Sequence, residues 1–349
     1  MKLAFAECDE AQLPALRDFF RRAYAPGYRL ASDEALLRWQ FAARDGAPGR
    51  FRIKIAARGD RIHGCLGYLP VEIDGGGRRL SGAWSANWMV EAEYRQSGLG
   101  ALLIRQLTSE HEMVFVAGLG HEAADFLRRL GWHDFGDLRR HIAVLDAGAT
   151  RRLLDGGHAP APVGGLRRPA RAAAIDVGEA AQVWEAAVST GLCGTRRSAS
   201  FLEWRYRRHP TFHYDLIGVR SASGAVGGFA VYRAEDVRDQ PVRVGRLVEF
   251  VAAGDAAAEL ADAVVAHAAA SGAALIDFFC ASRRFDGALV AAGFAADAGG
   301  AAGVPLVFQP IDRTRRGIRL MACLGALGDA APALDWYVTK GDGDQDRPN

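Results

Sequence analysis

The chain has 349 residues, of which 50% are hydrophobic and 24% are charged, a composition typical of globular proteins with room for two hydrophobic cores. A formal net charge of +2 argues against the basic surface of a nucleic-acid-binding protein, and five scattered cysteines without a CxxC pair argue against a disulfide framework or a zinc site. This cysteine usage fits a reducing cytoplasm, and no apolar run is long enough for a signal peptide or for a membrane span of roughly 20 residues.

In chain order, the first 146 residues alternate predicted strands and helices. Asp9 with Gln12 can cap a first helix, and Ser32 is the candidate cap of a second. A hairpin is expected to turn at Gly59-Asp60 because strand-like segments flank this pair. The predicted strands cover residues 3–7, 51–58, 61–73, 80–90, 113–119 and 138–146, and further helices are expected over 99–107 and 122–130.

The second half of the sequence repeats this plan at an offset near 162 residues. Five segments recur in the same order, which indicates an internal duplication or two domains of one fold. The matching pairs are residues 36–41 with 201–206, 62–68 with 225–232, 87–92 with 249–254, 113–119 with 274–280, and 126–132 with 288–294.

The expected fold class is α/β with mixed sheets, because helices lie between groups of strands that follow one another by hairpins. Each of two tandem domains should have a mostly antiparallel central sheet flanked by helices. The expected limits are 1–146 for the first domain, 147–172 for a linker rich in Gly, Pro, Ala and Arg, 173–335 for the second domain, and 336–349 for a polar tail.

The segment EAEYRQSGLGALL, residues 91–103, joins a predicted strand to a predicted helix. The first N–H groups of a helix lack internal partners, and the helix dipole adds partial positive charge there. Gly98 and Gly100 allow a close approach to these amides, and Arg95 can add a charge-assisted hydrogen bond. These features predict a phosphate or pyrophosphate site over residues 95–101.

The spacing from Val90 to Gly100 also resembles the acetyl-CoA signature of the GNAT superfamily of N-acetyltransferases. Arg95, Gly98 and Gly100 match the pattern Gln/Arg-x-x-Gly-x-Gly/Ala, whereas Ala92 stands where proline is common. The order of elements over residues 1–145 matches as well. The resemblance implies acetyl-CoA or another acyl-CoA as co-substrate, without a metal, bound by Met89, Val90, Arg95, Gln96, Ser97, Gly98, Leu99, Gly100 and Ala101.

The reaction implied by this resemblance is acyl transfer from acyl-CoA to an amine. An oxyanion donor is expected among the backbone amides near Met89 or Val90. The tyrosine that family members often use as an acid is replaced by Leu127, so the acid–base groups must be sought elsewhere. The candidates are His121, Glu72 and Glu91, with Glu93 and His63 as weaker ones, although each also fits a capping, exposed or ion-pairing role.

The acceptor is expected to be a primary amine on a small molecule, and by resemblance an amino sugar is one option. Trp84, Asn87 and Trp88 are candidate residues of its pocket, although tryptophans at such positions often pack in a core. Trp39 has a repeat partner in Trp204, which favours a structural role for both. No nucleic-acid partner and no membrane span are expected, and the sequence does not indicate the oligomeric state.

Different functions remain compatible with some features. Gly118-x-Gly120-x-x-Ala123 follows a strand and has the form of a dinucleotide fingerprint, but the next predicted helix is short, so an NAD-dependent oxidoreductase is a minor alternative. The equivalent loop of the second copy keeps Gly254 but lacks the Arg and the Gly-x-Gly pattern, so that copy should serve as scaffold, lid or acceptor platform. A FemABX-like aminoacyl transferase and a non-catalytic acyl-CoA sensor are also compatible with the sequence.

The polar tail has aspartates at D-x-D-x-D spacing, at Asp342, Asp344 and Asp346. A calcium loop would need Gly at its sixth position, where Arg347 stands, so metal binding is not expected. A tail held against the body of the protein would instead cover the acceptor cleft.

Overall fold

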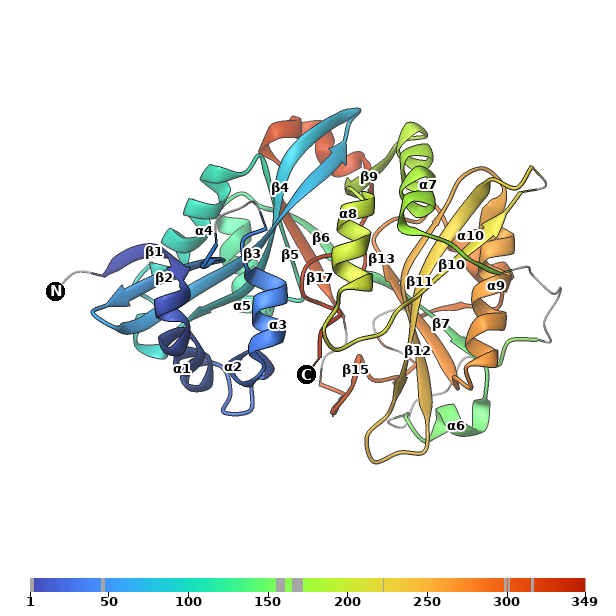
Figure 1. The fold of residues 1–349 in the computed structure, drawn as a ribbon, viewed down its shortest axis with the longest axis horizontal. Coiled ribbons are helices and arrows are strands. Elements are labelled where there is room, and N and C mark those ends of the chain that lie inside the picture. Colours follow the sequence, from blue (N-terminus) through green and yellow to red (C-terminus); the bar gives the residue numbers. More distant parts are fainter. Residues whose placement is uncertain are drawn as a thin grey trace.

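The computed structural model describes residues 3–44, 48–154, 161–164, 172–221, 223–297, 300, 302–314 and 317–348. Two sheets lie side by side, and the chain passes between them more than once (Figure 1). Much of the predicted linker, residues 155–160 and 165–171, and the last residue of the predicted tail lie outside the described residues.

The first sheet has nine strands in the described chain: β1 (Ala4–Asp9), β2 (Arg50–Arg58), β3 (Arg61–Gly75), β4 (Arg78–Val90), β5 (Met113–Ala117), β6 (His133–Asp137), β9 (Leu192–Thr195), β17 (Arg319–Cys323) and β18 (Asp335–Tyr337). Their order is β1-β2-β3-β4-β5-β17-β6, with β9 beside β3 and β18 beside β9. Strands β1 to β4 are antiparallel, whereas β5 runs parallel to β4. The predicted hairpins and their mixed sheet are therefore confirmed.

The second sheet has seven strands in the described chain, in the order β14-β7-β13-β12-β11-β10-β8. A separate two-stranded ribbon joins β15 to β16. The bounds of these strands are β7 (Arg139–Val144), β8 (Ala173–Ala174), β10 (Asp215–Arg220), β11 (Val226–Asp236), β12 (Arg243–Ala252), β13 (Leu275–Cys280), β14 (Ala295–Asp297), β15 (Val307–Phe308) and β16 (Ile311–Asp312).

Helices cover both sheets. The helices of the described chain are α1 (Leu13–Ala23), α2 (Arg29–Ser32), α3 (Glu34–Phe41), α4 (Leu99–Glu110), α5 (His121–Arg129), α6 (Ala147–Arg151), α7 (Val177–Ser189), α8 (Ala199–Leu202), α9 (Ala256–Ala270) and α10 (Asp286–Ala291). Four short helical segments add to them: η1 (Glu10–Gln12), η2 (Ala92–Tyr94), η3 (Glu203–Arg207, a π-helix) and η5 (Gly325–Ala333). Helices α1 to α3 share one core with the first sheet, and α4 and α5 share the core on its other face.

The helix starts follow capping chemistry. Asp9 and Gln12 form a reciprocal capping box ahead of α1, as predicted. The cap of α3 is Asp33, whose side chain accepts a hydrogen bond from the Leu36 amide, and not Ser32, which belongs to the preceding α2. The prediction for Ser32 was therefore wrong by one residue, because two polar residues compete at this boundary and the turn geometry selects the second.

Each sheet contains strands from the other half of the chain, and the first sheet holds β9 and β18 as well as β17. Strand β7 was expected to close the first domain, but it pairs antiparallel with β13 in the second sheet. Strand β17, from the C-terminal half, fills the place between β5 and β6 in the first sheet. The sequence of β7, RRHIAV, fits a strand but does not specify which sheet receives it. The domain limits at residues 146 and 173 stay predictions about the repeat, since each sheet contains strands from both halves.

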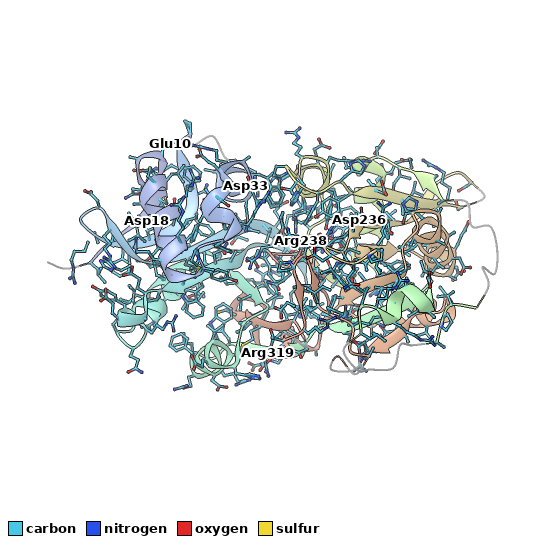
Figure 2. All side chains as sticks on the ribbon, turned by 90° about the horizontal axis from the view of Figure 1, so that it is seen from below. Glu10, Asp18, Asp33, Asp236, Arg238 and Arg319 are labelled. Carbon is cyan, nitrogen blue, oxygen red and sulfur yellow. The ribbon has the colours of Figure 1, made fainter. Side chains whose placement is uncertain are left out.

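The repeat-related tryptophans meet where the two halves join. The Trp39 Nε1 donates to the Trp204 carbonyl and the Trp204 Nε1 donates to the Trp39 carbonyl, both at 3.1 Å. Their rings stack with centroids 5.2 Å apart. In Figure 2, Glu10, Asp18 and Asp33 lie by the helices that cover one face of the first sheet, and Arg238 lies on the exposed turn between β11 and β12. This reciprocal contact supports the structural role expected for both tryptophans.

A membrane-spanning helix needs roughly 20 mostly apolar residues. None of the helices within the described ranges is long and apolar enough to cross a bilayer.

Candidate functional site

Strands β4 and β5 diverge in the middle of the first sheet. They pair at Ala83 with Val114 and at Trp84 with Phe115, and the described chain shows no pairing between them beyond this point. A register shift in the β3–β4 ladder accompanies the divergence, and Asn87 there has φ +50°, which is uncommon for a residue other than glycine. The bulge turns the end of β4 away from β5 and opens a fork in the sheet.

A cavity of about 210 Å³ occupies this fork. We call it the fork cavity. Residues from β4, from the end of β5, from the start of α5, from the end of α1 and from the C-terminal tail line it: Tyr24, Ser85, Ala86, Asn87, Trp88, Met89, Val116, Ala117, Gly118, Leu119, Gly120, Ala123, Asp344, Gln345 and Arg347.

Three polar atoms at the fork cavity are buried without a hydrogen-bond partner among the described residues. They are Ser85 Oγ, Asn87 Nδ2 and Trp88 Nε1. The other amide atom of Asn87, Oδ1, accepts a hydrogen bond from the Tyr28 hydroxyl, which fixes the orientation of the Asn87 side chain. Buried polar atoms in native structures are nearly always paired, so a cluster of unpaired ones around a cavity indicates a place for a polar ligand.

The loop between β4 and α4 has the geometry of an anion cradle. Gly98 has φ +80° and is the N-cap of α4, and no side chain caps this helix. The amide N–H groups of Gln96, Gly98, Gly100 and Ala101 have no hydrogen-bond partner in the described part of the chain. These donors lie at the positive end of a helix of 12 residues, on an exposed loop that also contains Arg95.

The end of β4 connects this loop to the fork cavity. The Glu91 amide donates to the His63 carbonyl of β3. Because successive amides of a strand point to opposite edges, the Val90 N–H faces away from β3, toward the open side of the fork. This is the position that the sequence predicts for an oxyanion donor. Met89 lines the cavity itself, next to Val90.

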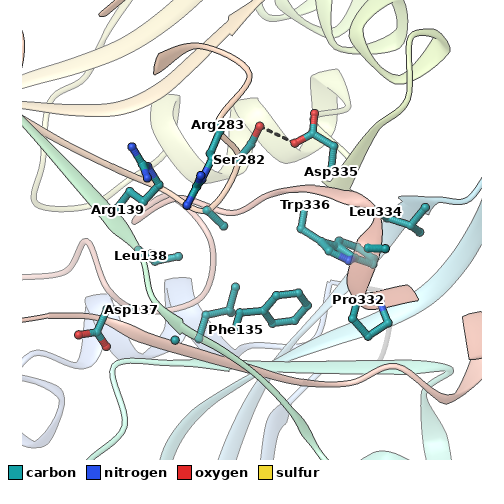
Figure 3. Close-up of a pocket in the computed structure, with 14 residues that line it drawn as sticks. Phe135, Asp137, Leu138, Arg139, Ser282, Arg283, Pro332, Leu334, Asp335 and Trp336 are labelled. Carbon is teal, nitrogen blue, oxygen red and sulfur yellow. Dashed lines mark hydrogen bonds between the residues drawn. The ribbon is translucent and has the colours of Figure 1, made fainter. Parts of the chain in front are cut away.

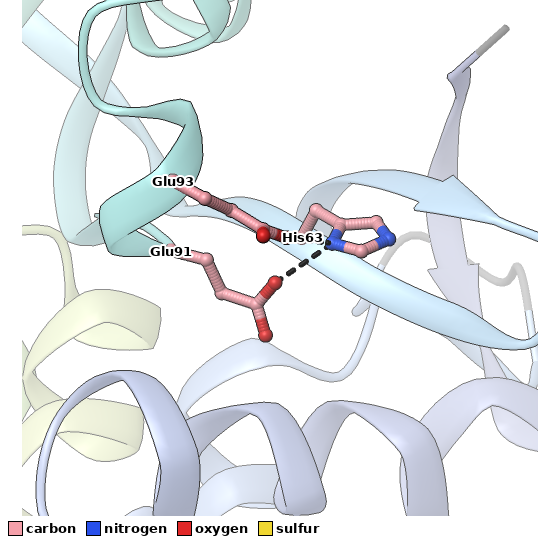
Figure 4. Close-up of side chains that lie close together, drawn as sticks. All are labelled: His63, Glu91 and Glu93. Carbon is pink, nitrogen blue, oxygen red and sulfur yellow. Dashed lines mark hydrogen bonds and ion pairs between the residues drawn. The ribbon is translucent and has the colours of Figure 1, made fainter.

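Glu91 is the centre of an ion-pair cluster, which Figure 4 shows in part. Its Oε2 lies 2.7 Å from His63 Nδ1, and its Oε1 accepts from Arg22 at 3.0 Å and from Arg61 at 3.1 Å. Glu93 Oε1 lies 3.6 Å from the same His63 nitrogen. Burial alone would raise the pKa of Glu91, but the hydrogen bonds from His63, Arg22 and Arg61 outweigh it and lower this pKa.

This cluster does not fit a metal ion or a catalytic base. His63, Glu91 and Glu93 bring three ligand atoms within 4.8 Å of one another. The two guanidinium groups already neutralise Glu91, so a divalent cation would compete with them for the same oxygen. The cluster does not line the fork cavity, and it holds the start of the loop against α1 through Arg22.

The other predicted acid–base residues lie apart from the fork cavity. Glu72 lies opposite Ser81 in the β3–β4 ladder, and its exposed carboxylate is 3.9 Å from Arg196. His121 is exposed at the start of α5, between cavity residues but not among them. Leu127, at the position of the absent tyrosine, is completely buried. The structure therefore brings none of these side chains to the cavity, and a catalytic role for them stays a prediction.

The three predicted pocket residues differ in their surroundings. Trp84 is 1% exposed, stacks on Phe115 and donates to Thr195 Oγ1, which are the contacts of a core residue. Asn87 and Trp88 line the fork cavity, and Trp88 also packs against Gly100 at the start of α4. Trp88 thus connects the cavity with the loop.

The sequence missed the residues that the C-terminal tail brings to the cavity. The Gln345 side chain lies in the fork, where its Nε2 donates to the Ala117 carbonyl at 3.0 Å. Asp344 Oδ1 accepts from the same Nε2 at 2.9 Å, and Asp344 Oδ2 accepts from Arg347 at 2.5 Å. The sequence hints at this position of the tail only through the D-x-D-x-D spacing. Asp342 and Asp346 hold the tail in place by pairing with Arg197 and Arg233, which lie far away in the chain.

Two larger cavities lie elsewhere. One of about 500 Å³ lies between the end of β6 and the segment before β18, and there Ser282 Oγ donates to Asp335 (Figure 3). Another of about 700 Å³ adjoins the β3–β4 turn and α7. Neither is lined by a residue of the fork cavity, so neither contains the unpaired atoms of Ser85, Asn87 and Trp88.

The dinucleotide fingerprint does not form its own site. After Gly120 the helix α5 ends at Arg129, and the chain continues into β6 and then β7, which belong to different sheets. A dinucleotide site would need a longer helix that leads into a parallel neighbour of β5. Gly118 instead faces Gln345, whose side chain would collide with any Cβ at this position.

Comparisons with known proteins agree with this geometry. Residues 6–134 match a family model described as an acetyltransferase (GNAT) domain. No relative was found among curated proteins. The GNAT resemblance predicted from the sequence is thus confirmed for the segment that contains the fork and the loop.

Solved structures share the fold over most of the chain. A GCN5-related N-acetyltransferase from Anabaena variabilis is similar with a TM-score of 0.60 and 13% identity, over 93% of this chain and 74% of that one. One from Kribbella flavida has a TM-score of 0.53 and 18% identity, over 92% and 70%. N-myristoyltransferase from Saccharomyces cerevisiae, with bound myristoyl-CoA, has a TM-score of 0.54 and 12% identity, over 91% and 82%. At these identities the likeness concerns the fold alone.

Proposed function

With residues 6–134 matched to a GNAT acetyltransferase domain, we propose that this protein transfers a short acyl group, acetyl in the simplest case, from acyl-CoA to a primary amine. One observation carries the proposal. The unpaired amides of the loop at residues 96–101 and the unpaired polar atoms of the fork cavity lie at the two ends of one stretch of β4.

The loop and the fork cavity adjoin, because Trp88 lines the cavity and packs against Gly100 at the start of α4. A diphosphate held by the loop amides and Arg95 would place a long, amide-containing arm along the open edge of β4, because unpaired strand edges bind extended chains through their amides. The thioester would then reach the fork cavity beside the Val90 amide, which can stabilise the developing oxyanion.

The size of the fork cavity favours a short acyl group. At about 210 Å³ it has room for an acetyl group beside the reacting amine. We propose a small amine as acceptor, with the second half of the chain as its supporting scaffold and the cytoplasm as the location. A non-catalytic acyl-CoA sensor is the second candidate, because Leu127 replaces the usual acid.

The test compares two matched glycine variants. Gly98 and Gly131 have φ values of +80° and +83°, and a Cβ added to either glycine would meet no atom within 4 Å, so a side chain strains both backbones equally. Gly98→Glu should reduce acetyl-CoA binding more than tenfold, measured by calorimetry, because its carboxylate repels the diphosphate. Gly131→Glu should bind like the wild type.

Activity assays on a panel of amines separate the two candidate functions. An enzyme should release CoA from acetyl-CoA with at least one amine, and more slowly from long-chain acyl-CoA. Binding of acetyl-CoA without turnover of any amine would favour the sensor, and equal binding by the two glycine variants would refute the loop as the site.

A further inference from the structure

We propose that Asp344, in the C-terminal tail, is the general base that accepts the proton of the acceptor amine. The proposal rests on the proposed function and adds the acid–base group that the sequence did not supply. It would also explain why the second half of the chain, whose own loop lacks the Arg and the Gly-x-Gly pattern, holds the tail so firmly.

The carboxylates near the fork cavity are the candidate bases. Among the described residues that line it, Asp344 is the one with a carboxylate. Glu91 is bound by two arginines outside the cavity, and Glu72 lies on the exposed part of the β3–β4 hairpin. A general base must lie within hydrogen-bond reach of the reacting nitrogen, directly or through one water molecule. Of these three carboxylates, Asp344 is the one whose position meets this condition.

Hydrogen bonds fix the orientation of the Asp344 carboxylate but do not use all of its acceptor positions. Its Oδ1 accepts from Gln345 Nε2 at 2.9 Å and its Oδ2 accepts from Arg347 Nη1 at 2.5 Å. Gln345 is fixed in turn by the Ala117 carbonyl at the end of β5. A carboxylate has about four lone-pair positions, so two of them stay available to an amine or a water molecule in the cavity. The Asp344 side chain is 9% exposed, which limits competition from bulk water.

The tail is a fixed wall of the cavity because the second half of the chain holds its neighbours. Arg197 donates to Asp342 at 2.7 Å, and Arg233 donates to Asp346 at 2.7 Å. Arg205 donates to the carbonyl of Asp346. All three arginines are buried, so removing the tail would leave three buried cations without these partners. This favours a permanent role in the site over that of a plug that acyl-CoA displaces.

The charged and titratable groups that face Asp344 are Arg347 of the tail and Tyr24 and Tyr28 near the end of α1. Burial alone would lower the pKa of Arg347, but Asp344 and the two tyrosines raise it, so Arg347 stays charged. Burial raises the pKa of Tyr28 above its usual range, so Tyr28 stays neutral at ordinary pH. Arg347 and Tyr28 therefore keep one protonation state near pH 7.

The chemical step balances without a further reactant. An ammonium group that enters the cavity gives one proton to Asp344 and becomes a free amine. The amine nitrogen attacks the thioester carbon, the N–C bond forms and the C–S bond breaks. The second proton of the nitrogen ends on the CoA thiolate, and Asp344 returns its proton to solvent. The products are an amide and free CoA.

The experiment measures kcat and the KM of the amine from pH 6 to 10 for the wild type, Asp344→Asn and Asp344→Glu. Asp125→Asn is the matched control, because Asp125 also pairs with an arginine three residues later but on exposed α5. Binding of acetyl-CoA is measured in parallel for every variant. We expect Asp344→Asn to lose about 100-fold in kcat at pH 7 and to recover toward pH 10, where solvent supplies free amine. Asp344→Glu should retain more activity, and Asp125→Asn should equal the wild type.

Each other outcome overturns a defined part of the argument. Wild-type activity in Asp344→Asn, or activity above it, would refute the base and identify the tail as dispensable or as a plug. A loss that is the same at every pH, or an equal loss in Asp344→Glu and Asp344→Asn, would indicate a structural role and refute the base as well. A wild type that binds acetyl-CoA but acylates no amine would overturn the proposed function itself, and with it the role of Asp344.

Discussion

The last residues of β4 bring three unpaired buried polar atoms to one cavity, whereas some buried polar residues elsewhere are fully hydrogen-bonded. Glu249, for example, is completely buried yet accepts hydrogen bonds from Arg197, Tyr206 and Tyr337. Asn87, in contrast, keeps a buried amide nitrogen without a partner among the described residues. The grouping of such unpaired donors around one cavity marks a place that a ligand can fill.

Glu91 allows a residue-scale prediction about pH. Because the pKa of Glu91 is lowered in the folded protein, its contribution to stability is fully present above the unfolded value and is lost as the pH falls through the folded value. We expect Glu91→Gln to lower the free energy of unfolding by about 1–3 kcal/mol at pH 7, as for hydrogen bonds to charged groups. The difference from the wild type should shrink below about pH 4, where the carboxylate begins to take up a proton, as measured by urea unfolding.

Glu93→Gln is the control for this prediction, since Glu93 is 64% exposed and lies farther from His63. It should change the free energy of unfolding by less than about 0.5 kcal/mol. A Glu91→Gln variant as stable as the wild type at pH 7 would mean that burial of the carboxylate cancels its ion pairs.

The sequence predicts the loop residues and, among the residues that line the fork cavity, Asn87, Trp88 and Met89, but not those from α1 and the tail. Arg95, Gly98 and Gly100 follow one another at short spacing, and the chemistry of helix starts makes that spacing meaningful. Tyr24 and Asp344 meet only because α1 and the tail converge on the same fork. The spacing of residues in the sequence does not reveal that Tyr24 and Asp344 line the same cavity, because this depends on how both halves of the chain pack.

At the scale of elements, the alternation of apolar and polar residues and the residues typical of turns predicted the individual strands well. The hairpin of β2 and β3 turns at the expected residues, and β5 has the expected buried run. The exchange of β7 and β17 was not predictable in this way. Both strands are short, and β7 begins with two arginines and a histidine, so neither sequence names the sheet that receives it. Their registers with β13 and β5 are set by the tertiary fold.

The exchange predicts that the N-terminal half does not fold alone. A fragment of residues 1–146 would lack β17 between β5 and β6 and would leave β7 without β13 and β14. We expect it to show poor amide dispersion by NMR and no cooperative thermal transition, whereas the full chain unfolds cooperatively. Addition of the separately expressed C-terminal half should restore the missing strands.

A cooperative, well-dispersed fragment would contradict this expectation. It would show that the first sheet can close without β17, and that the limit predicted at residue 146 marks an independent folding unit.

At the scale of the whole molecule, two features join the halves. The reciprocal Trp39–Trp204 pair lies between equivalent positions of the repeat, so duplication alone explains its symmetry. The tail breaks that symmetry, because Asp346 is held by Arg233 of the second sheet while Gln345 enters the fork of the first. The second half therefore stabilises the candidate site from outside the segment that forms it.

This asymmetry predicts a large stability difference between two Asp–Arg pairs. Asp346 is 2% exposed and binds Arg233 through both carboxylate oxygens, whereas Asp236 is 72% exposed and binds Arg243 in a similar way. Burial alone would raise the pKa of Asp346, but Arg233 holds it far below its usual range, so the pair is charged at pH 7. We expect Asp346→Asn to cost about 3–5 kcal/mol of unfolding free energy and Asp236→Asn less than about 1 kcal/mol, measured by urea unfolding at pH 7. Equal costs would mean that the tail is not anchored by this pair, and the wall of the fork cavity would then need another support.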